Sequence, residues 1–274
     1  MTGQPTGAGP VVSVVVAAYQ VERWIGRFLD SVLAQTLDPA AVELVVVDDG
    51  STDGTGALLD AFAADRPGVV VVHQANSGGP GGPRNTGVRL SRGEFLFFAD
   101  PDDVLAPDGL ELLVAAARRN DADVVLGRLV GVGRSAPRAP FAADVERGDV
   151  WSTRAVWSLS AQKLFRRDLV VENGLRFVEG LRYAEDQEFV LGAYLAARRS
   201  RSSRAGPAPT SCCARTPATP PEPWPTPPPC TASSTGRSAS SRPASRPARA
   251  ATTSSSGSSR SRCSSRCSGT TCWG

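Results

Sequence analysis

The chain of 274 residues is long enough for one domain with a sizeable core or for two small domains. Its formal net charge of +3 is the sum of two parts of the chain with opposite net charges. Residues 1–198 hold 19 basic and 26 acidic side chains, a net charge of −7, whereas residues 199–274 hold 11 arginines and one acid, a net charge of +10. The positive sum is therefore not the footprint of a nucleic-acid-binding surface, and we expect no nucleic-acid partner.

The distribution of polar residues and cysteines bears on cellular location. Residues 1–10 (MTGQPTGAGP) are polar and rich in glycine and proline, which predicts a flexible N-terminus and not a signal peptide. No run of about twenty apolar residues occurs, so no membrane span is expected. All six cysteines lie beyond residue 198, and the rest of the chain shows no sign of an oxidising compartment. We therefore expect a cytoplasmic location.

Short β-branched runs alternate with amphipathic stretches between residues 11 and 127. The pattern predicts strands at 11–17, 42–47, 69–73, 94–99 and 122–126, and helices at 21–35, 55–64, about 84–90 and 107–119. Such alternation is typical of an α/β fold with a mostly parallel sheet and helices on both faces. Ligands of these sheets bind beyond the carboxyl ends of the strands, so the residues at those ends are the first site candidates.

Polar clusters follow three of the predicted strands directly. The first strand ends in AAYQ, the second in DDGSTDGT and the fourth in ADPDD. Each cluster alone has a local explanation, since Asp and Gly form turns and cap helices, and Asp53 is placed to cap the helix that follows it. Three clusters at one edge of a sheet favour a ligand site.

The ADPDD cluster places Asp100, Asp102 and Asp103 within four residues. Carboxylates this close repel one another, whereas a divalent cation would reverse the sign of the interaction. Carboxylate oxygens suit Mg²⁺ or Mn²⁺, and such sites usually combine one or two carboxylates with substrate phosphates. The alternative is a solvated acidic turn in which Asp103 or Asp108 caps the 107–119 helix.

A glycine-rich stretch, NSGGPGGPRNTG, occupies residues 76–87 and precedes a predicted helix. It has the composition of a phosphate cradle, with Arg84 as the natural partner of a phosphate or a base carbonyl. The stretch lacks the Gly-Lys-Ser/Thr of a Walker loop, and no GxGxxG follows the first strand. The alternative for Arg84 is a surface residue at the start of a helix.

The ordered motifs VSVVVAAYQ, FLDSVLAQTL, ELVVVDDGSTDGT, NSGGPGGPRNTGV and GEFLFFADPDD resemble the family 2 glycosyltransferases of bacterial surface-polysaccharide synthesis. The likeness runs from Val11 to Asp103 and resumes over residues 161–197. There Glu185-Asp186 matches a Glu-Asp pair that opens a helix in the family. The resemblance implies the GT-A fold, which is Rossmann-like, and a metal-dependent, inverting transfer from a nucleotide-diphosphate sugar.

The resemblance also implies a role for each matched residue. On the donor side, Tyr19 packs against the base, Asp49 and less clearly Asp48 bond it, and Asn76 and Arg84 contact the nucleotide. Asp100 faces the ribose and the metal, and Asp102 binds the metal at the diphosphate. Mn²⁺ or Mg²⁺ is the expected cofactor, and a UDP-sugar the expected donor.

On the acceptor side, the resemblance makes Asp186 the general base, with Glu185 beside it. An acceptor hydroxyl needs such a base in the transition state, and a single carboxylate suffices for inversion. The alternative for both is a negatively charged first helical turn, stabilised by the helix dipole. The expected acceptor is a polysaccharide, teichoic-acid-like or lipid-linked molecule, which would place the enzyme at the inner face of the membrane with a peripheral contact.

These roles divide the chain at about residue 127. Residues 11–127 form the predicted nucleotide-sugar-binding subdomain, and residues 128–198 the acceptor-side subdomain with the base. The 128–150 segment shows no period and is expected to be a loop over the site or an acceptor contact. Trp151 and Trp157 are candidates either for sugar stacking or for core or hinge packing. His73, which ends a strand without a recognisable acidic partner, is expected to be structural.

Residues 199–274 use a different alphabet. Apart from Glu222, they consist of Ala, Pro, Ser, Thr, Cys, Arg, Gly and Trp alone, whose codons can all carry C or G in the second position. A frameshift in a GC-rich gene would produce this set, and shifting the frame back turns SRSSRAG into a strand after the 185–198 helix. The alternative is a genuine low-complexity tail that binds an acidic surface. On either hypothesis the tail is expected to be disordered, because it cannot bury enough apolar surface to fold.

Two other functions fit parts of the sequence. An inactive nucleotide-sugar-binding remnant, lacking its C-terminal acceptor region, would follow if the tail replaces that region. A nucleotidyltransferase on a similar sheet is disfavoured, because the first loop lacks a glycine-rich, basic signature.

Overall fold

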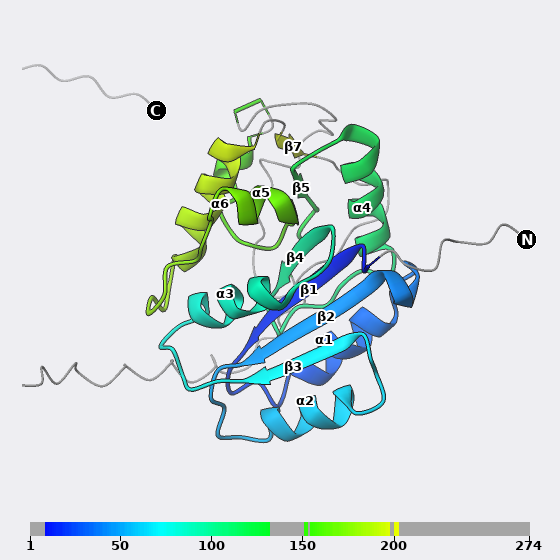
Figure 1. Ribbon diagram of the computed structural model, residues 1–274, viewed down its shortest axis with the longest axis vertical. Helices are drawn as coiled ribbons and strands as arrows, with labels where there is room; N and C mark the ends of the chain where they lie inside the picture. The colour runs from blue at the N-terminus through cyan, green and yellow to red at the C-terminus, as the bar shows by residue number, and fades with distance from the viewer. Residues whose placement is uncertain (1–8, 132–150, 153, 198–199, 203–274) are drawn as a thin grey trace, which may run out of the picture. The chain divides into compact units, whose positions relative to one another are not determined.

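The computed structural model describes residues 9–131, 151–152, 154–197 and 200–202 (Figure 1). Most of the N-terminal residues, the 128–150 loop and the 199–274 tail lies outside the described residues. The flexibility of the N-terminus, the position of the loop over the site and the frameshift origin of the tail therefore stay predictions. None of the helices in the described ranges has the length and hydropathy needed to cross a membrane.

A seven-stranded mixed sheet forms the centre, in the order β3-β2-β1-β4-β6-β5-β7. The strands are β1 Val12–Ala18, β2 Val42–Asp48, β3 Val69–His73, β4 Phe95–Ala99, β5 Val124–Leu126, β6 Leu164–Arg166 and β7 Ser200–Ser202. Strand β1 is parallel to β2 and β4, and β2 is parallel to β3. Strand β6 is antiparallel to β4 and β5, and β7 is parallel to β5.

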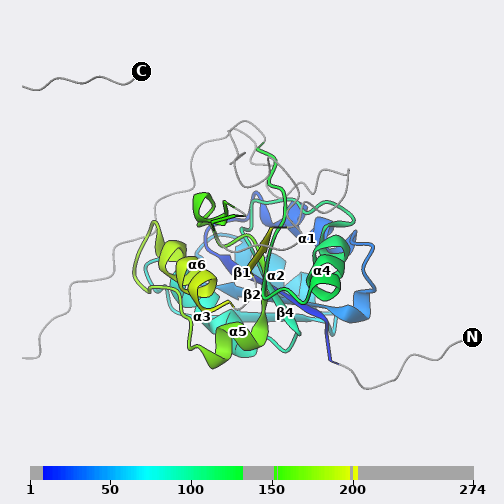
Figure 2. The same ribbon diagram turned by 90° about the horizontal axis from the view of Figure 1, so that it is seen from above.

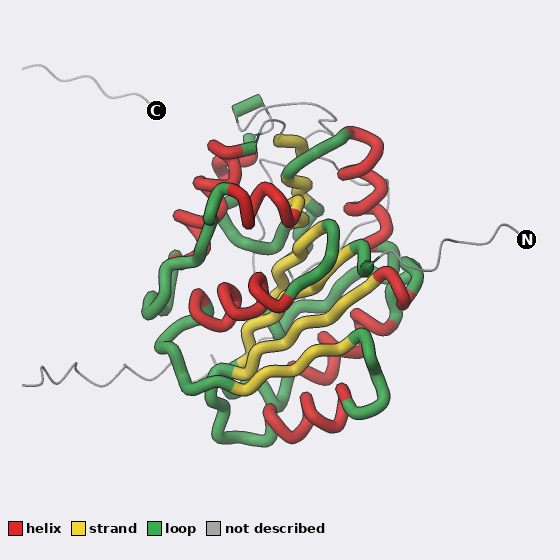
Figure 3. The backbone as a smooth tube through the Cα atoms, viewed as in Figure 1, coloured by secondary structure: helices red, strands yellow, loops and turns green. Residues whose placement is uncertain are grey.

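Helices cover both faces of this sheet (Figures 2 and 3). They are α1 Ile25–Leu33, α2 Thr55–Ala63, α3 Gly81–Leu90, α4 Gly109–Asn120, α5 Arg167–Glu172 and α6 Glu185–Ala196. One core packs α1, α2 and α4 against alternate residues of β1, β2 and β4, and a second core packs α5 and α6 against the other face. The predicted α/β fold, mostly parallel with helices on both faces, is confirmed.

Strand β6 and helix α5 are elements that the sequence pattern did not predict. The strand has only three residues, too few for a period to be visible, and α5 follows it without a loop. Its pairing between β4 and β5 makes the sheet mixed, because β6 runs against both neighbours. Helix α3 also begins at Gly81, three residues before the predicted start at Arg84.

An aromatic cluster fills the second core close to the strand ends. The ring of Phe98 lies 5.7 Å from Phe165, 5.0 Å from Phe177 and 5.4 Å from Phe189, edge-on to each. Phe177 and Phe189 stack with centroids 4.0 Å apart. Edge-to-face and stacked pairs of this kind stabilise beyond the area that they bury. The cluster therefore fixes the segment before α6, and the start of α6, against β4.

The glycine at position 87 allows α3 to pack on the sheet. A Cβ atom on Gly87 would overlap the side chain of Val15, which is fully buried in β1. By contrast, a Cβ on Gly26 in α1 would meet no atom within 4 Å.

We expect Gly87→Ala to destabilise the fold by about 1–3 kcal/mol, because the close-packed sheet cannot move away from the added methyl group. The matched substitution Gly26→Ala should be neutral or stabilising by up to about 1 kcal/mol, because alanine is the better helix former. Urea unfolding followed by circular dichroism measures both. Equal stabilities for the two variants would contradict this account of the α3 packing.

Candidate active site

The carboxyl ends of β1, β2 and β4 meet at one edge of the sheet, where Tyr19, Asp49 and Asp100 follow the strands. Because β6 is antiparallel and its Leu164 pairs with Phe97, the residues just before β6 arrive at the same edge. The structure thus brings the three predicted clusters together and adds a fourth segment that the sequence did not reveal.

The loops after β1 and β2 are joined to each other by hydrogen bonds. Gln20, which has a positive φ of 51°, accepts the backbone amides of Thr52 at 2.9 Å and Asp53 at 3.1 Å. Asp53 accepts the Thr55 amide at 3.1 Å, but the N-cap position of α2 is Gly54 and no side chain caps the helix, so the capping interpretation of Asp53 is wrong. Tyr19, which directly precedes Gln20, is half-buried.

Asp49 is fully buried, and its carboxylate bonds to the loop that leads to α3. It accepts from the Gln74 amide at 2.5 Å, the Ser77 backbone amide at 2.9 Å and the Ser77 hydroxyl at 3.0 Å. Burial raises the pKa of Asp49, and these hydrogen bonds oppose that effect. Asn76 donates to the Asp49 carbonyl at 2.9 Å, so the two predicted base and nucleotide contacts are neighbours.

Asp48 is also buried, and its carboxylate bonds to residues other than those that Asp49 contacts. One of its oxygens accepts the Ser51 amide at 3.1 Å, and the other lies 2.8 Å from Nδ1 of His73. Nε2 of His73 lies 3.0 Å from Asp60 in α2. Strand pairing and α2 thus bring two distant carboxylates to one imidazole, contacts that no sequence pattern around His73 revealed. Hydrogen bonds to Asp48 and then to Asp60 raise the pKa of His73.

Arg84 connects the end of β4 to the start of α6. Its guanidinium donates to Asp100 at 2.8 Å and to Glu185 at 2.5 Å, and it lies over the Phe177 ring with its carbon 5.3 Å from the centroid. The side chain is only 6% exposed, so the alternative of a surface residue is wrong. Burial alone would lower the pKa of Arg84, but the charges of Asp100, Glu185 and Asp186 outweigh it and raise that pKa.

The two acidic residues that open α6 differ in environment. Glu185 is buried against Arg84, and burial raises its pKa although the guanidinium opposes this. Asp186 is half-buried. The two neighbouring carboxylates thus differ in burial: Glu185 lies in the protein interior, and Asp186 is partly accessible.

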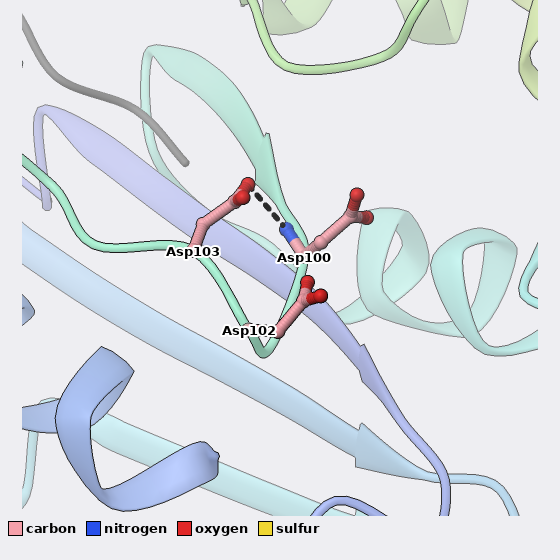
Figure 4. Close-up of side chains that lie close together, drawn as sticks. All are labelled: Asp100, Asp102 and Asp103. Carbon is pink, nitrogen blue, oxygen red and sulfur yellow. Dashed lines mark hydrogen bonds between the residues drawn. The ribbon is translucent and has the colours of Figure 1, made fainter. Parts of the chain in front are cut away.

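The acidic cluster after β4 forms a tight turn. The Asp103 carboxylate turns back to accept the Asp100 backbone amide at 3.2 Å, whereas Asp100 and Asp102 point to the same side (Figure 4). Oxygens of the three carboxylates all lie within 4.8 Å of one another. Asp108 occupies the N-cap position of α4 without a side-chain capping bond. The carboxylate oxygens of this cluster suit Mg²⁺ or Mn²⁺, and Asp100 and Asp102 lie on the same side of the turn.

The glycine-rich stretch packs closely against the segment before α6. Cβ atoms on Gly79 and Gly81 would overlap the backbone carbonyls of Leu181 and Val178. Asn85 strengthens the same contact, since it donates to the Phe177 carbonyl at 3.0 Å and accepts the Phe177 amide at 2.9 Å. The amino end of α3 is therefore buried against the 177–181 segment, which holds α6 in place.

The segment before β6 adds two residues that the sequence analysis missed. Gln162 donates to Asp100 at 2.6 Å, and Lys163 is only 1% exposed. Neither carries a motif signal, although a lysine that introduces an apolar run (KLF) is a weak pointer to burial. Trp151 and Trp157 are both 72% exposed, so the core-packing alternative for them is wrong.

The Asp48–His73–Asp60 contact predicts a pH dependence of stability. Because the pKa of His73 is raised above its ordinary value of 6.5, its contribution is complete below pH 6.5 and is lost as pH rises through the folded-state pKa. We expect His73→Gln to lower the melting temperature more at pH 6 than at pH 8.5. Thermal unfolding across this range measures it. A difference in melting temperature between His73→Gln and wild type that does not change with pH would contradict the assigned pairing. We expect the pH-dependent difference to be modest, because the imidazole is 46% exposed to solvent.

Comparisons with known proteins agree with the fold and the motifs. The poly(ribitol-phosphate) beta-glucosyltransferase of Bacillus spizizenii is 35% identical over 190 residues, 69% of this chain and 30% of the relative. TarP of Staphylococcus aureus, a poly(ribitol-phosphate) beta-N-acetylglucosaminyltransferase, is 34% identical over 66% of this chain and 56% of its own length. The chain thus spans about a third to a little over half of these relatives.

Solved structures give the same answer. The crystal structure of S. aureus TarS 1–349 in complex with UDP-GlcNAc superimposes with a TM-score of 0.68 at 34% identity, covering 70% of this chain and 55% of that one. A mannosyltransferase from Pyrobaculum calidifontis, at 22% identity and a TM-score of 0.54, shares the fold. The family described as Glycosyl transferase family 2 matches residues 13–170. The chain therefore belongs to glycosyltransferase family 2 and has the GT-A fold.

Proposed function

We propose that this chain is a metal-dependent, inverting glycosyltransferase that moves a sugar from a UDP-sugar to a polyol-phosphate or related cell-surface polymer. The observation that carries the proposal is the Asp100–Arg84–Glu185 bridge. This bridge holds the carboxylate cluster after β4, whose residue types suit a metal ion, and the Glu185-Asp186 pair at the start of α6 at the same edge of the sheet. The two halves of a sugar-transfer site thereby face the same space.

On the donor side, Asp100 and Asp102 would hold Mn²⁺ or Mg²⁺, which when bound neutralises the charge that develops on the departing diphosphate. The nucleotide would lie along the ends of β1 and β2, against Tyr19. Asp49 would act by fixing the loop, with its buried carboxylate bonded to Ser77 and its backbone carbonyl bonded to Asn76. TarS, a relative at 34% identity, is described in complexes with UDP and with UDP-GlcNAc, which supports uridine as the base.

On the acceptor side, Asp186 would take the proton from the attacking hydroxyl. Glu185 is already paired with Arg84 and turned inward, so it would position the helix and leave Asp186 as the one base. A single displacement with inversion needs only one such carboxylate, whereas a double displacement needs a positioned nucleophile as well. The exposed Trp151 and Trp157 would be available for stacking on sugar rings.

The acceptor class is supported by the relatives named for poly(ribitol-phosphate). Such a polymer is made at a membrane, and the proposed setting is the cytoplasmic face with a peripheral contact. We propose no nucleic-acid partner, since residues 1–198, which hold all of the described elements except β7, carry a net charge of −7.

Asp102→Ala and Asp186→Asn should each lower sugar transfer by about 100-fold or more while the domain stays folded. Asp102→Ala should also weaken donor binding in the presence of Mn²⁺, whereas Asp186→Asn should leave it unchanged. Radiolabelled sugar transfer and titration calorimetry measure the two effects. Asp30→Asn, an exposed change in α1, is the matched control and should be silent. Full transfer by either site variant would refute the roles assigned to them.

A second candidate function is an inactive nucleotide-sugar-binding remnant. The altered composition of residues 199–274 favours it, because relatives extend well beyond the part that this chain matches. The remnant would bind the donor without turnover, and a chain with the tail translated in the alternative frame would regain transfer. Transfer by the chain as it stands would exclude the remnant, and resequencing the gene would test the frameshift directly.

A further inference from the structure

Gln162 is a polar side chain at the active-site edge to which the proposed mechanism gives no part. It lies two residues before β6, and its side-chain amide donates to Oδ2 of Asp100 at 2.6 Å. The two residues lie 62 positions apart in the sequence and meet because β6 pairs with β4 in the antiparallel direction. The segment before β6 thus reaches the carboxylate cluster after β4 through a side-chain contact.

Asp100 is held through its carboxylate and through its backbone. Arg84 donates to Oδ1 at 2.8 Å, and Gln162 donates to Oδ2. The backbone amide of Asp100 donates to the Asp103 carboxylate at 3.2 Å. Each carboxylate oxygen has two lone pairs, so each can accept one of these hydrogen bonds and still offer a lone pair to a cation. The two donors therefore fix the direction of the carboxylate and leave it able to bind an ion.

The two donors to Asp100 differ in charge. The guanidinium of Arg84 brings a positive charge, which it shares between Asp100 and Glu185. The amide of Gln162 is neutral, so it orients Asp100 without changing the net charge at the cluster. Hydrogen bonds of this kind orient metal-binding carboxylates, and losing such a partner typically weakens metal binding by about 10–100-fold.

The backbone that carries Gln162 is fixed by contacts of its neighbour Lys163. The Lys163 side chain is buried, and its Nζ donates to the Ser158 hydroxyl at 3.3 Å and to the Ser160 carbonyl. The Tyr194 hydroxyl of α6 donates to the Ser158 carbonyl at 2.9 Å. The segment is therefore tied to its own turn and to α6, and the amide of Gln162 is presented from a fixed backbone.

We propose that Gln162 is a positioning residue for a divalent-cation site at the carboxylate cluster, and that its amide holds Asp100 in the orientation in which Asp100 and Asp102 bind the ion together. The inference rests on the proposed function, in which these two carboxylates take Mn²⁺ or Mg²⁺. Gln162 acts through Asp100, because the amide nitrogen that faces Asp100 is a hydrogen-bond donor and not a metal ligand. The proposed acceptor-side part of the chain, residues 128–198, thereby contributes to the donor side of the site.

The test compares Gln162→Leu with wild type in the full chain. Mn²⁺ is titrated in the presence of excess UDP, and the free ion is measured by electron paramagnetic resonance. Leucine is similar in size to glutamine but donates no hydrogen bond, so Asp100 loses one of its two side-chain donors. We expect the Kd of Mn²⁺ to rise by about 10–100-fold. The measurement involves no sugar transfer and therefore reports the metal site itself.

Sugar transfer gives a second readout, which separates positioning from a general structural role. In Gln162→Leu the Mn²⁺ concentration for half-maximal transfer should rise together with the Kd of Mn²⁺. The kcat at saturating Mn²⁺ should return close to the wild-type value, because excess ion fills the weakened site by mass action. A damaged fold would instead lower kcat at every Mn²⁺ concentration.

Gln35→Leu is the matched control, because it removes the same kind of amide from a place without carboxylates. Gln35 is buried, and among the described residues its amide bonds to the backbones of Ser31, Ala106 and Leu110. Losing these hydrogen bonds should lower the melting temperature and leave the Kd of Mn²⁺ unchanged.

A shorter amide serves if Gln162→Leu does not fold. Gln162→Asn keeps the amide but is one methylene group too short to reach Asp100, so it should also raise the Kd of Mn²⁺. A Kd equal to that of wild type in the variant that folds would overturn the inference. A rise of equal size in Gln35→Leu would overturn it too, because the effect would then follow stability and not the contact with Asp100.

The same titration distinguishes failure of this inference from failure of the proposed function. A wild-type chain that binds no Mn²⁺ in the presence of UDP and transfers no sugar would refute the proposed function, and the role of Gln162 with it. A wild-type chain that binds Mn²⁺, with the same Kd in Gln162→Leu, would refute the role of Gln162 alone.

Discussion

The burial of one guanidinium is the constraint on which the rest of the site depends. Arg84 is nearly inaccessible, so its charge must be balanced by carboxylates at hydrogen-bond distance, because an unpaired buried charge would cost several kcal/mol. The two balancing groups, Asp100 and Glu185, come from segments 85 residues apart in the sequence. Once both are fixed on the same fork, the metal-type cluster and the first turn of α6 cannot move independently.

This constraint explains features that seem unrelated in the sequence. The glycines at 79 and 81 let the 177–181 backbone approach α3, and Asn85 locks that approach with two bonds to Phe177. The Phe177 ring then lies beneath the guanidinium and against the aromatic cluster of β4 and α6. A stretch with the composition of a phosphate loop thus also packs against the segment that leads into α6.

Much of the fold could be predicted from the sequence. Buried parallel strands are visible as runs of β-branched residues, and their alternation with helices is compatible with few topologies. The positions of Asp49, Asp100 and Asp102 at strand ends followed from the same rule. The antiparallel β6 could not be predicted, since three residues carry no period and its partners are distant. Because β6 was not predicted, Gln162 and Lys163 were not recognised as site residues, since their place at the site depends on the direction of that strand.

Pairings between distant side chains were the other gap. That Asp49 turns inward to Ser77, that Asp48 meets His73 and that Glu185 meets Arg84 are facts of strand order and helix packing. A motif match places a residue at the site but cannot say which neighbour occupies its oxygens. Two adjacent acids in one motif, Glu185 and Asp186, consequently have different environments, and only the structure distinguishes the buried partner of a cation from its half-buried neighbour.

The point where the composition changes can be read in the same physical terms. Strand β7 pairs with β5 immediately after α6, where the alternative reading frame predicts a strand. Backbone ladders need no particular side chains, so a Ser-Arg-Ser segment can occupy that place in the sheet. The frameshift stays a prediction, and the place of β7 beside β5 is the structural observation that bears on it.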